Sequence, residues 1–98
     1  MREYQKMVAK MTEEHKELFD NFKDIHNEYA LNPQQWQKLF NQYGAEIVEI
    51  IRDYDRRLCA NMATGKYGRF SIKLSEKFWA EVKKIFPMID FVGVVVEA

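Results

Sequence analysis

Apolar residues recur at alternating spacings of four and three through the first thirty positions, with no glycine or proline between them. A sustained 3.5-residue period is typical of an amphipathic α-helix that packs along its whole length. We therefore expect one helix over residues 2–30. The residues of this stripe are Tyr4, Val8, Met11, His15, Leu18, Phe22, Ile25 and Tyr29.

A second helix is expected directly after the first. Asn32 is a good N-cap, and Pro33 suits the first helical position. The apolar rhythm then continues through Trp36, Phe40, Tyr43 and Ile47, and it is unchanged across Gly44. A glycine inside a helix costs about 1 kcal/mol relative to alanine, which leaves a break at Gly44 open. The unchanged rhythm favours one continuous helix over residues 33–63.

The last third of the chain predicts a loop, a third helix and an apolar tail. The loop covers residues 64–74, and Ser75 is the expected N-cap of an amphipathic helix over residues 75–86. Residues 88–97 are apolar on both faces and rich in β-branched side chains. They predict a short strand, paired with residues 69–74 or with another chain, or an extended tail that lies across the helical core.

These elements predict a single mainly α domain of 98 residues: a long antiparallel helical hairpin, a third amphipathic helix, and the C-terminal strand or tail. A 28-residue helix is about 42 Å long, so the hairpin is expected to be elongated. The second helix has a broader apolar arc than one neighbour covers. The third helix or a second copy of the chain could cover the rest, and a homodimer is the more economical solution. Its expected interface residues are Val48, Ile51, Cys59, Phe91, Val92 and Val94.

The sequence carries no recognisable catalytic or metal-binding pattern. His15 and His26 are eleven residues apart, about 16 Å along a helix, which is too far for one metal ion. His15 is expected as a hydrogen-bonded core residue, with a pH-sensitive position as the alternative, and His26 as a surface residue. The glycines near Lys66 lack the spacing of a phosphate-binding loop. We expect no catalytic residues, no cofactor and no metal.

One cysteine, Cys59, excludes an intrachain disulfide and fits a reducing compartment. Nothing near it in the sequence would act as a base, so a small buried side chain is the expected role. No signal peptide is apparent, and no apolar run approaches the roughly 18–20 residues that span a bilayer. These features predict a cytoplasmic protein without a membrane partner.

Charge is balanced overall, with 15 basic and 15 acidic residues, but residues 52–84 carry nine cations against four anions. This asymmetry predicts a basic tip at one end of the hairpin, where Phe70 and Tyr67 could stack on bases. The alternative for its arginines is a solvated helix face crossed by ion pairs. The partner-binding candidates at the tip are Arg52, Arg56, Arg57, Lys66, Tyr67, Arg69 and Lys73.

The sustained apolar stripe, the neutral total charge and 14% aromatic residues favour a small non-catalytic protein-interaction module. It would act as a regulator, adaptor or inhibitor, in the manner of compact phage or mobile-element proteins, with another protein as partner and as a homodimer. The alternative is a nucleic-acid-binding module that uses the basic tip, although the acidic first helix and the missing DNA- or RNA-binding motifs disfavour it.

Overall fold

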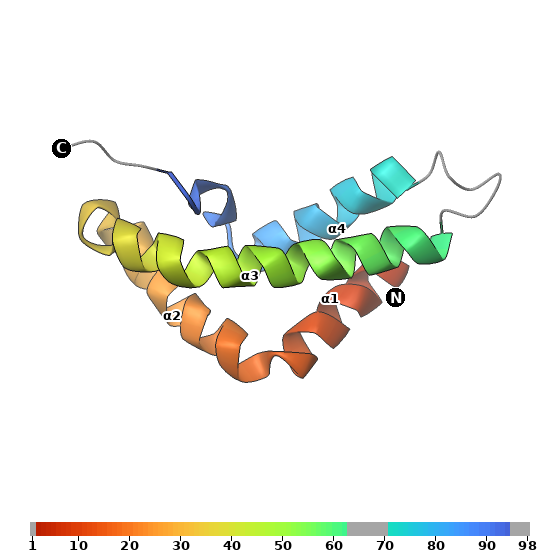
Figure 1. Ribbon diagram of the computed structural model, residues 1–98, viewed down its shortest axis with the longest axis horizontal. Helices are drawn as coiled ribbons and strands as arrows, with labels where there is room; N and C mark the ends of the chain where they lie inside the picture. Colours follow the sequence, from red (N-terminus) through yellow and green to blue (C-terminus); the bar gives the residue numbers. More distant parts are fainter. Residues whose placement is uncertain (1, 63–70, 95–98) are drawn as a thin grey trace.

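The computed structural model describes residues 2–62 and 71–94 (Figure 1). These residues are almost entirely helical and include no β-strand, so the predicted mainly α class is confirmed. The elements, in chain order, are α1 (Glu3–Glu14), α2 (Lys16–Leu31), α3 (Pro33–Met62), α4 (Ser71–Ile85) and a 3-10 turn, η2 (Ile89–Phe91).

The first expected helix is broken. His15 has φ −121° and ψ 35°, outside the helical region, and it separates α1 from α2. The two helices diverge from this point because α1 packs chiefly on α4 whereas α2 packs on α3 (Figure 1). Tyr54 of α3 contacts the bend: its hydroxyl donates a hydrogen bond to Glu14, and its ring meets the His15 ring edge-on at 5.9 Å. One straight helix could not follow both partners.

The connection between α2 and α3 is a single residue, Asn32. Its side-chain oxygen accepts a hydrogen bond from the Gln35 backbone N–H at 3.4 Å, and its amide donates to the Gln35 side chain at 2.9 Å. Asn32 and Gln35 thus cap the start of α3 immediately after the end of α2. With so short a connection, the two helices run in opposite directions and pack on each other (Figure 1).

Helix α3 continues through Gly44 without a break. A Cβ atom at this position would lie 2.7 and 2.8 Å from the two γ-carbons of Val92, and 3.3 Å from Cε1 of Phe22. The missing side chain therefore allows the chain near the C-terminus to approach the α3 backbone.

Helix α4 begins at Ser71, four residues before the expected N-cap. Ser75 lies inside the helix, and its hydroxyl donates a hydrogen bond to Asp55 of α3 at 2.9 Å. The indole N–H of Trp79 donates to the same carboxylate oxygen at 3.3 Å. Because residues 71–74 are helical, they form no strand, which corrects that expectation. Residues 64–70 of the expected loop lie outside the described part of the chain.

The expected C-terminal strand is also absent from the described residues. After Ile85 the chain makes two turns and η2, and residues 88–94 lie against α2 and α3. We call residues 88–94 the C-terminal segment. It follows the alternative expectation, a tail across the helical core, because side chains of the helices bind its backbone groups. Residues 95–98 lie outside the described residues.

The core lies along α3, where the other helices meet it. Its densest part is aromatic: the rings of Phe22 and Phe40 stack at 5.4 Å, and Phe86 meets Phe22 edge-on at 5.1 Å. The buried apolar residues are Val8, Met11, Phe19, Phe22, Tyr29, Phe40, Ile47, Ile51, Tyr54, Leu58, Phe78, Val82, Phe86 and Ile89.

The molecule measures 49 × 27 × 18 Å, with a radius of gyration of 14.7 Å. A helix with its side chains is about 10–12 Å across, so the thin dimension holds only two helices. Each long helix therefore keeps one face open to solvent. In the described part of the chain, none of the helices combines the length and the apolar character needed to cross a bilayer.

Candidate functional site

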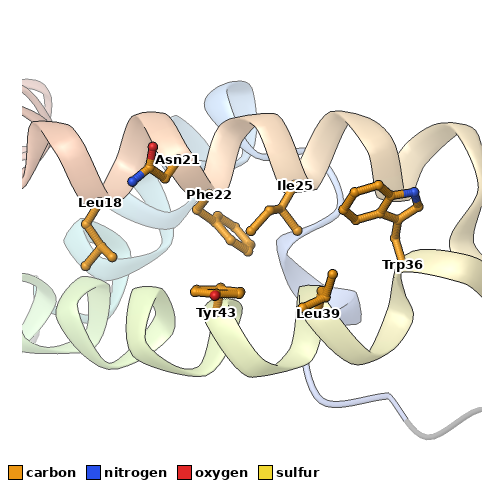
Figure 2. Close-up of a pocket in the computed structure, with 7 residues that line it drawn as sticks. All are labelled: Leu18, Asn21, Phe22, Ile25, Trp36, Leu39 and Tyr43. Carbon is orange, nitrogen blue, oxygen red and sulfur yellow. The ribbon is translucent and has the colours of Figure 1, made fainter.

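An apolar cleft of about 380 Å³ lies between α2 and α3 (Figure 2). Side chains from the two helices point toward one another across it, with Phe22 at its floor and Trp36 at the end nearest the α2–α3 connection. The cleft is lined by Leu18, Asn21, Phe22 and Ile25 of α2, and by Trp36, Leu39 and Tyr43 of α3.

Helical spacing explains how these residues reach one cleft. Leu18 and Ile25 are two turns apart on α2, as Trp36 and Tyr43 are on α3. Sequence analysis assigned these four to the packed stripes of the two helices, yet no further helix covers them here. Leu39 and Tyr43 are 40% and 42% exposed. The cleft is therefore an apolar face that lacks a neighbour within the described chain.

The rim of the cleft is acidic. Successive helical residues are rotated by about 100°, so Glu17, Asp24 and Glu28 form a row just outside Leu18 and Ile25 on α2. All three carboxylates are exposed. Across the cleft, the exposed Glu46 follows Tyr43 by one turn of α3.

These four rim carboxylates differ from most others in the structure. Within residues 2–62 and 71–94, no Lys or Arg is at ion-pair distance from any of them. Of the ten other carboxylates in the same ranges, six have cationic partners, namely Glu3, Asp20, Glu49, Asp53, Glu81 and Asp90, whereas Glu13, Glu14, Asp55 and Glu76 have none among the described residues. Half of the eight described carboxylates without a described cationic partner therefore lie beside the cleft.

A second, more polar hollow continues the cleft past Leu18 and Asn21, which line both. Glu14, His15 and Glu17 line this hollow as well. Lys16 also lines it, but its ammonium group is in an ion pair with Asp20. The hollow therefore extends the acidic character of the rim toward the bend between α1 and α2.

Three polar side chains bind the backbone of the C-terminal segment, and we call them the clamp: His26, Gln37 and Asn41. The Met88 N–H donates to Nε2 of His26 at 3.0 Å, and Nε2 of Gln37 donates to the Phe91 carbonyl at 3.3 Å. The Asn41 side chain accepts from the Gly93 N–H at 2.8 Å and donates to the Val94 carbonyl at 2.9 Å. Sequence analysis missed these residues, because Gln and Asn carry no signal of burial.

The expectation that His26 lies on the surface is wrong. Its side chain is only 3% exposed and packs among Phe22, Phe40 and Phe86. Because Nε2 accepts a hydrogen bond, the neutral ring carries its proton on Nδ1. That buried Nδ1 has no hydrogen-bond partner among the described residues. Burial lowers the pKa of His26; an interaction with the Asn27 side chain opposes this shift, and the nearby Lys23 ammonium adds to it.

The described arginines of the expected basic tip pair with acidic residues of their own helix. Arg57 lies 2.7 Å from Asp53, Arg56 lies 3.7 Å from the same carboxylate, and Arg52 lies 3.1 Å from Glu49. This matches the alternative of an ion-paired, solvated face. Lys73 is exposed on α4. The remaining candidates, Lys66, Tyr67, Arg69 and Phe70, lie outside the described residues.

The residues expected at an oligomer interface are distributed over different environments. Ile51 is fully buried in the core, so it offers no surface to a second copy in this conformation. Val48 is half-buried, and Val92 packs on Gly44. Phe91 and Val94, both in the C-terminal segment, are 46% and 42% exposed.

Cys59 lies on α3 one turn after Asp55, to which its thiol donates a hydrogen bond at 3.6 Å. Burial raises the pKa of the Cys59 thiol, and the Asp55 carboxylate raises it further. The thiol is therefore protonated at neutral pH, the opposite of what a nucleophilic cysteine needs.

No group of three or more His, Cys, Asp or Glu side chains within the described ranges could hold a metal ion. No protein-family model, curated protein or solved structure matches this chain. The cleft, with its acidic rim, is thus the feature from which a function can be argued.

Proposed function

We propose that the protein is a non-catalytic protein-interaction module, a regulator, adaptor or inhibitor, that receives part of another protein in the cleft between α2 and α3. The observation that carries this proposal is the open apolar lining, with Leu39 and Tyr43 about two-fifths exposed. Exposed apolar side chains that gather in a groove often mark a binding site. Aromatic side chains such as Trp36 and Tyr43 are also the residues most often found at the centre of interfaces.

Site-specific photocrosslinking tests this proposal. A photoreactive phenylalanine analogue replaces Tyr43 in the cleft or, as a control, Leu31 at the end of α2. Leu31 is 82% exposed and does not line the cleft. In extract of the source cell, we expect a discrete crosslinked protein from position 43 and none from position 31. Crosslinking from position 31 alone would contradict the proposal.

A matched pair of variants separates binding from folding. Leu39→Ser removes an exposed leucine from the cleft, whereas Leu31→Ser removes one outside it. We expect Leu39→Ser to weaken capture of the crosslinked partner at least about tenfold, the loss that follows from removing about 1.4 kcal/mol of contact. Leu31→Ser should leave capture unchanged. Thermal unfolding checks that both variants remain folded.

Association of two copies is a separate proposal, supported by the exposed Phe91 and Val94 of the C-terminal segment. Asn41, whose side chain binds this segment, is on the opposite side of α3 from Leu39 and Tyr43, so a dimer formed there would leave the cleft open. Sedimentation equilibrium of the wild type and of Phe91→Ser measures this directly. A wild-type protein that stays monomeric at high concentration would reject the dimer.

A further inference from the structure

We propose that the partner element bound in the cleft is an amphipathic α-helix whose apolar stripe is flanked by Lys or Arg residues. This inference rests on the proposed function and adds the chemistry of the partner. It is argued from the dimensions of the cleft and from the charge of its rim.

The dimensions fit two turns of a helix. Leu18 to Ile25 on α2 and Trp36 to Tyr43 on α3 each span seven residues, about 10.5 Å at 1.5 Å per residue. An incoming helix with apolar residues at positions i, i+4 and i+7 presents its side chains over the same length. Because the cleft lies between two adjacent antiparallel helices, a third helix laid along it completes a packed layer.

The negative charge of the rim favours a positively charged partner helix. By helical rotation, Glu17, Asp24 and Glu28 flank one side and Glu46 the other, all exposed and none in an ion pair with a described residue. On α3 the exposed Lys38 directly precedes Leu39, so the α3 side carries one cation as well as Glu46, and the negative charge of the rim comes from the three carboxylates of α2. Lys or Arg residues beside the partner's apolar stripe would supply the missing counter-charges.

The same charges disfavour other occupants. If two copies of this chain docked cleft to cleft around a two-fold axis, the acidic rim of one copy would face the acidic rim of the other. Nucleic acids and anionic membranes would be repelled by the rim for the same reason. A basic amphipathic helix is the occupant that satisfies both the apolar lining and the acidic rim.

Two 18-residue helical peptides test the inference. Both carry the same leucine stripe, flanked by lysines in one peptide and by glutamates in the other. Each exposed ion pair contributes only modestly, so three or four pairs together predict about tenfold tighter binding of the lysine peptide in 50 mM salt. The difference should shrink in 500 mM salt, where charges are screened. Isothermal titration calorimetry measures both affinities, with Tyr43→Ser as the cleft-defective control.

Charge reversal provides the stricter test. In the triple variant Glu17→Lys, Asp24→Lys and Glu28→Lys, the preference should switch to the glutamate peptide. A control variant with the same change in net charge, Glu3→Lys, Glu13→Lys and Glu76→Lys, reverses carboxylates of α1 and α4, helices that do not form the cleft. This control should retain the preference for the lysine peptide.

The outcomes separate the inference from the proposed function. Equal binding of both peptides, lost in Tyr43→Ser, would overturn the charge of the partner and leave the cleft as a docking site. A wild-type dimer that dissociates in Tyr43→Ser would identify a second copy as the occupant and overturn the inference. Failure of crosslinking from position 43, described above, is the result that rejects the docking function itself.

Discussion

Gly44 and Val92 are in such close contact that a side chain at residue 44 would overlap the side chain of Val92. Gly44→Ala gains about 1 kcal/mol of helix propensity, but its Cβ would lie within 2.8 Å of both Val92 γ-carbons. Overpacking of this kind typically costs 1–3 kcal/mol. We therefore expect Gly44→Ala to lower the free energy of unfolding by about 1 kcal/mol, as measured by urea denaturation.

The control is the same change in a Val92→Ala background. With the γ-carbons removed, the added methyl group no longer clashes, and the substitution should become neutral or stabilising. The two effects of Gly44→Ala should therefore differ by about 1–3 kcal/mol across the double-mutant cycle. Additive effects would show that the contact with Val92 does not limit residue 44.

The buried His26 makes the stability depend on pH. Its folded-state pKa is lowered, chiefly by burial, so below the unfolded-state pKa of about 6.5 the unfolded chain binds more protons than the folded one. Its stabilising effect is then complete above pH 6.5 and decreases as the pH falls toward the lowered folded-state pKa. We expect the free energy of unfolding to fall between pH 7 and pH 5.

The variant His26→Gln keeps a polar side chain but cannot titrate, so it should flatten this pH dependence even if its stability is lower throughout. His15→Gln, a change at the half-exposed histidine of the α1–α2 bend, should keep most of the slope. Urea denaturation at several pH values measures all three proteins. An unchanged slope in His26→Gln would assign the effect to other groups.

At the scale of elements, Asn41 attaches the C-terminal segment to α3. Its side chain bonds the Gly93 N–H and the Val94 carbonyl much as a neighbouring peptide group would. We expect Asn41→Ala to speed hydrogen exchange of the Gly93 amide while the amides of α3 stay protected. Gln42→Ala, at the exposed neighbouring position, should leave that exchange rate unchanged.

Asp55 similarly joins α3 to α4 by accepting hydrogen bonds from Ser75 and Trp79. Because Asp55→Ala leaves both partly buried donors without their acceptor, we expect a loss of about 1–3 kcal/mol in the free energy of unfolding. Asp53→Ala breaks only exposed pairs with Arg56 and Arg57, and it should cost less than about 1 kcal/mol. Equal losses would mean that Asp55 does not couple the helices.

The start and continuity of α3 could be predicted from the sequence, whereas the break at His15 and the course of the tail could not, and the reasons are physical. The Asn32–Pro33 signal and the apolar rhythm are local, and α3 starts and continues as they indicate. The break at His15 depends on Tyr54, whose hydrogen-bond partner Glu14 is forty positions away, and on the different partners of α1 and α2. The apolar tail has strand composition, but its backbone partners are side chains of the clamp, which composition cannot reveal.

At the scale of the whole molecule, the sequence predicted an elongated helical protein with surplus apolar surface but not where that surface lies. Periodicity assigns Leu18, Ile25 and Tyr43 to a packed face without saying whether a neighbour covers it. In a molecule 18 Å thick, α4 packs on α1 and α3, and nothing described covers the cleft side of α2. The acidic rim became visible only when the ion pairs of the other carboxylates were known.

The clamp has a consequence for solubility. The C-terminal segment leads into a run of three valines, Val94 to Val96, and a short, uncharged, β-branched stretch of this kind pairs readily with copies of itself once its backbone is accessible. The amides of Gln37 and Asn41 keep the start of this stretch engaged within one molecule. A protein that releases its terminus is therefore expected to aggregate before its helices unfold.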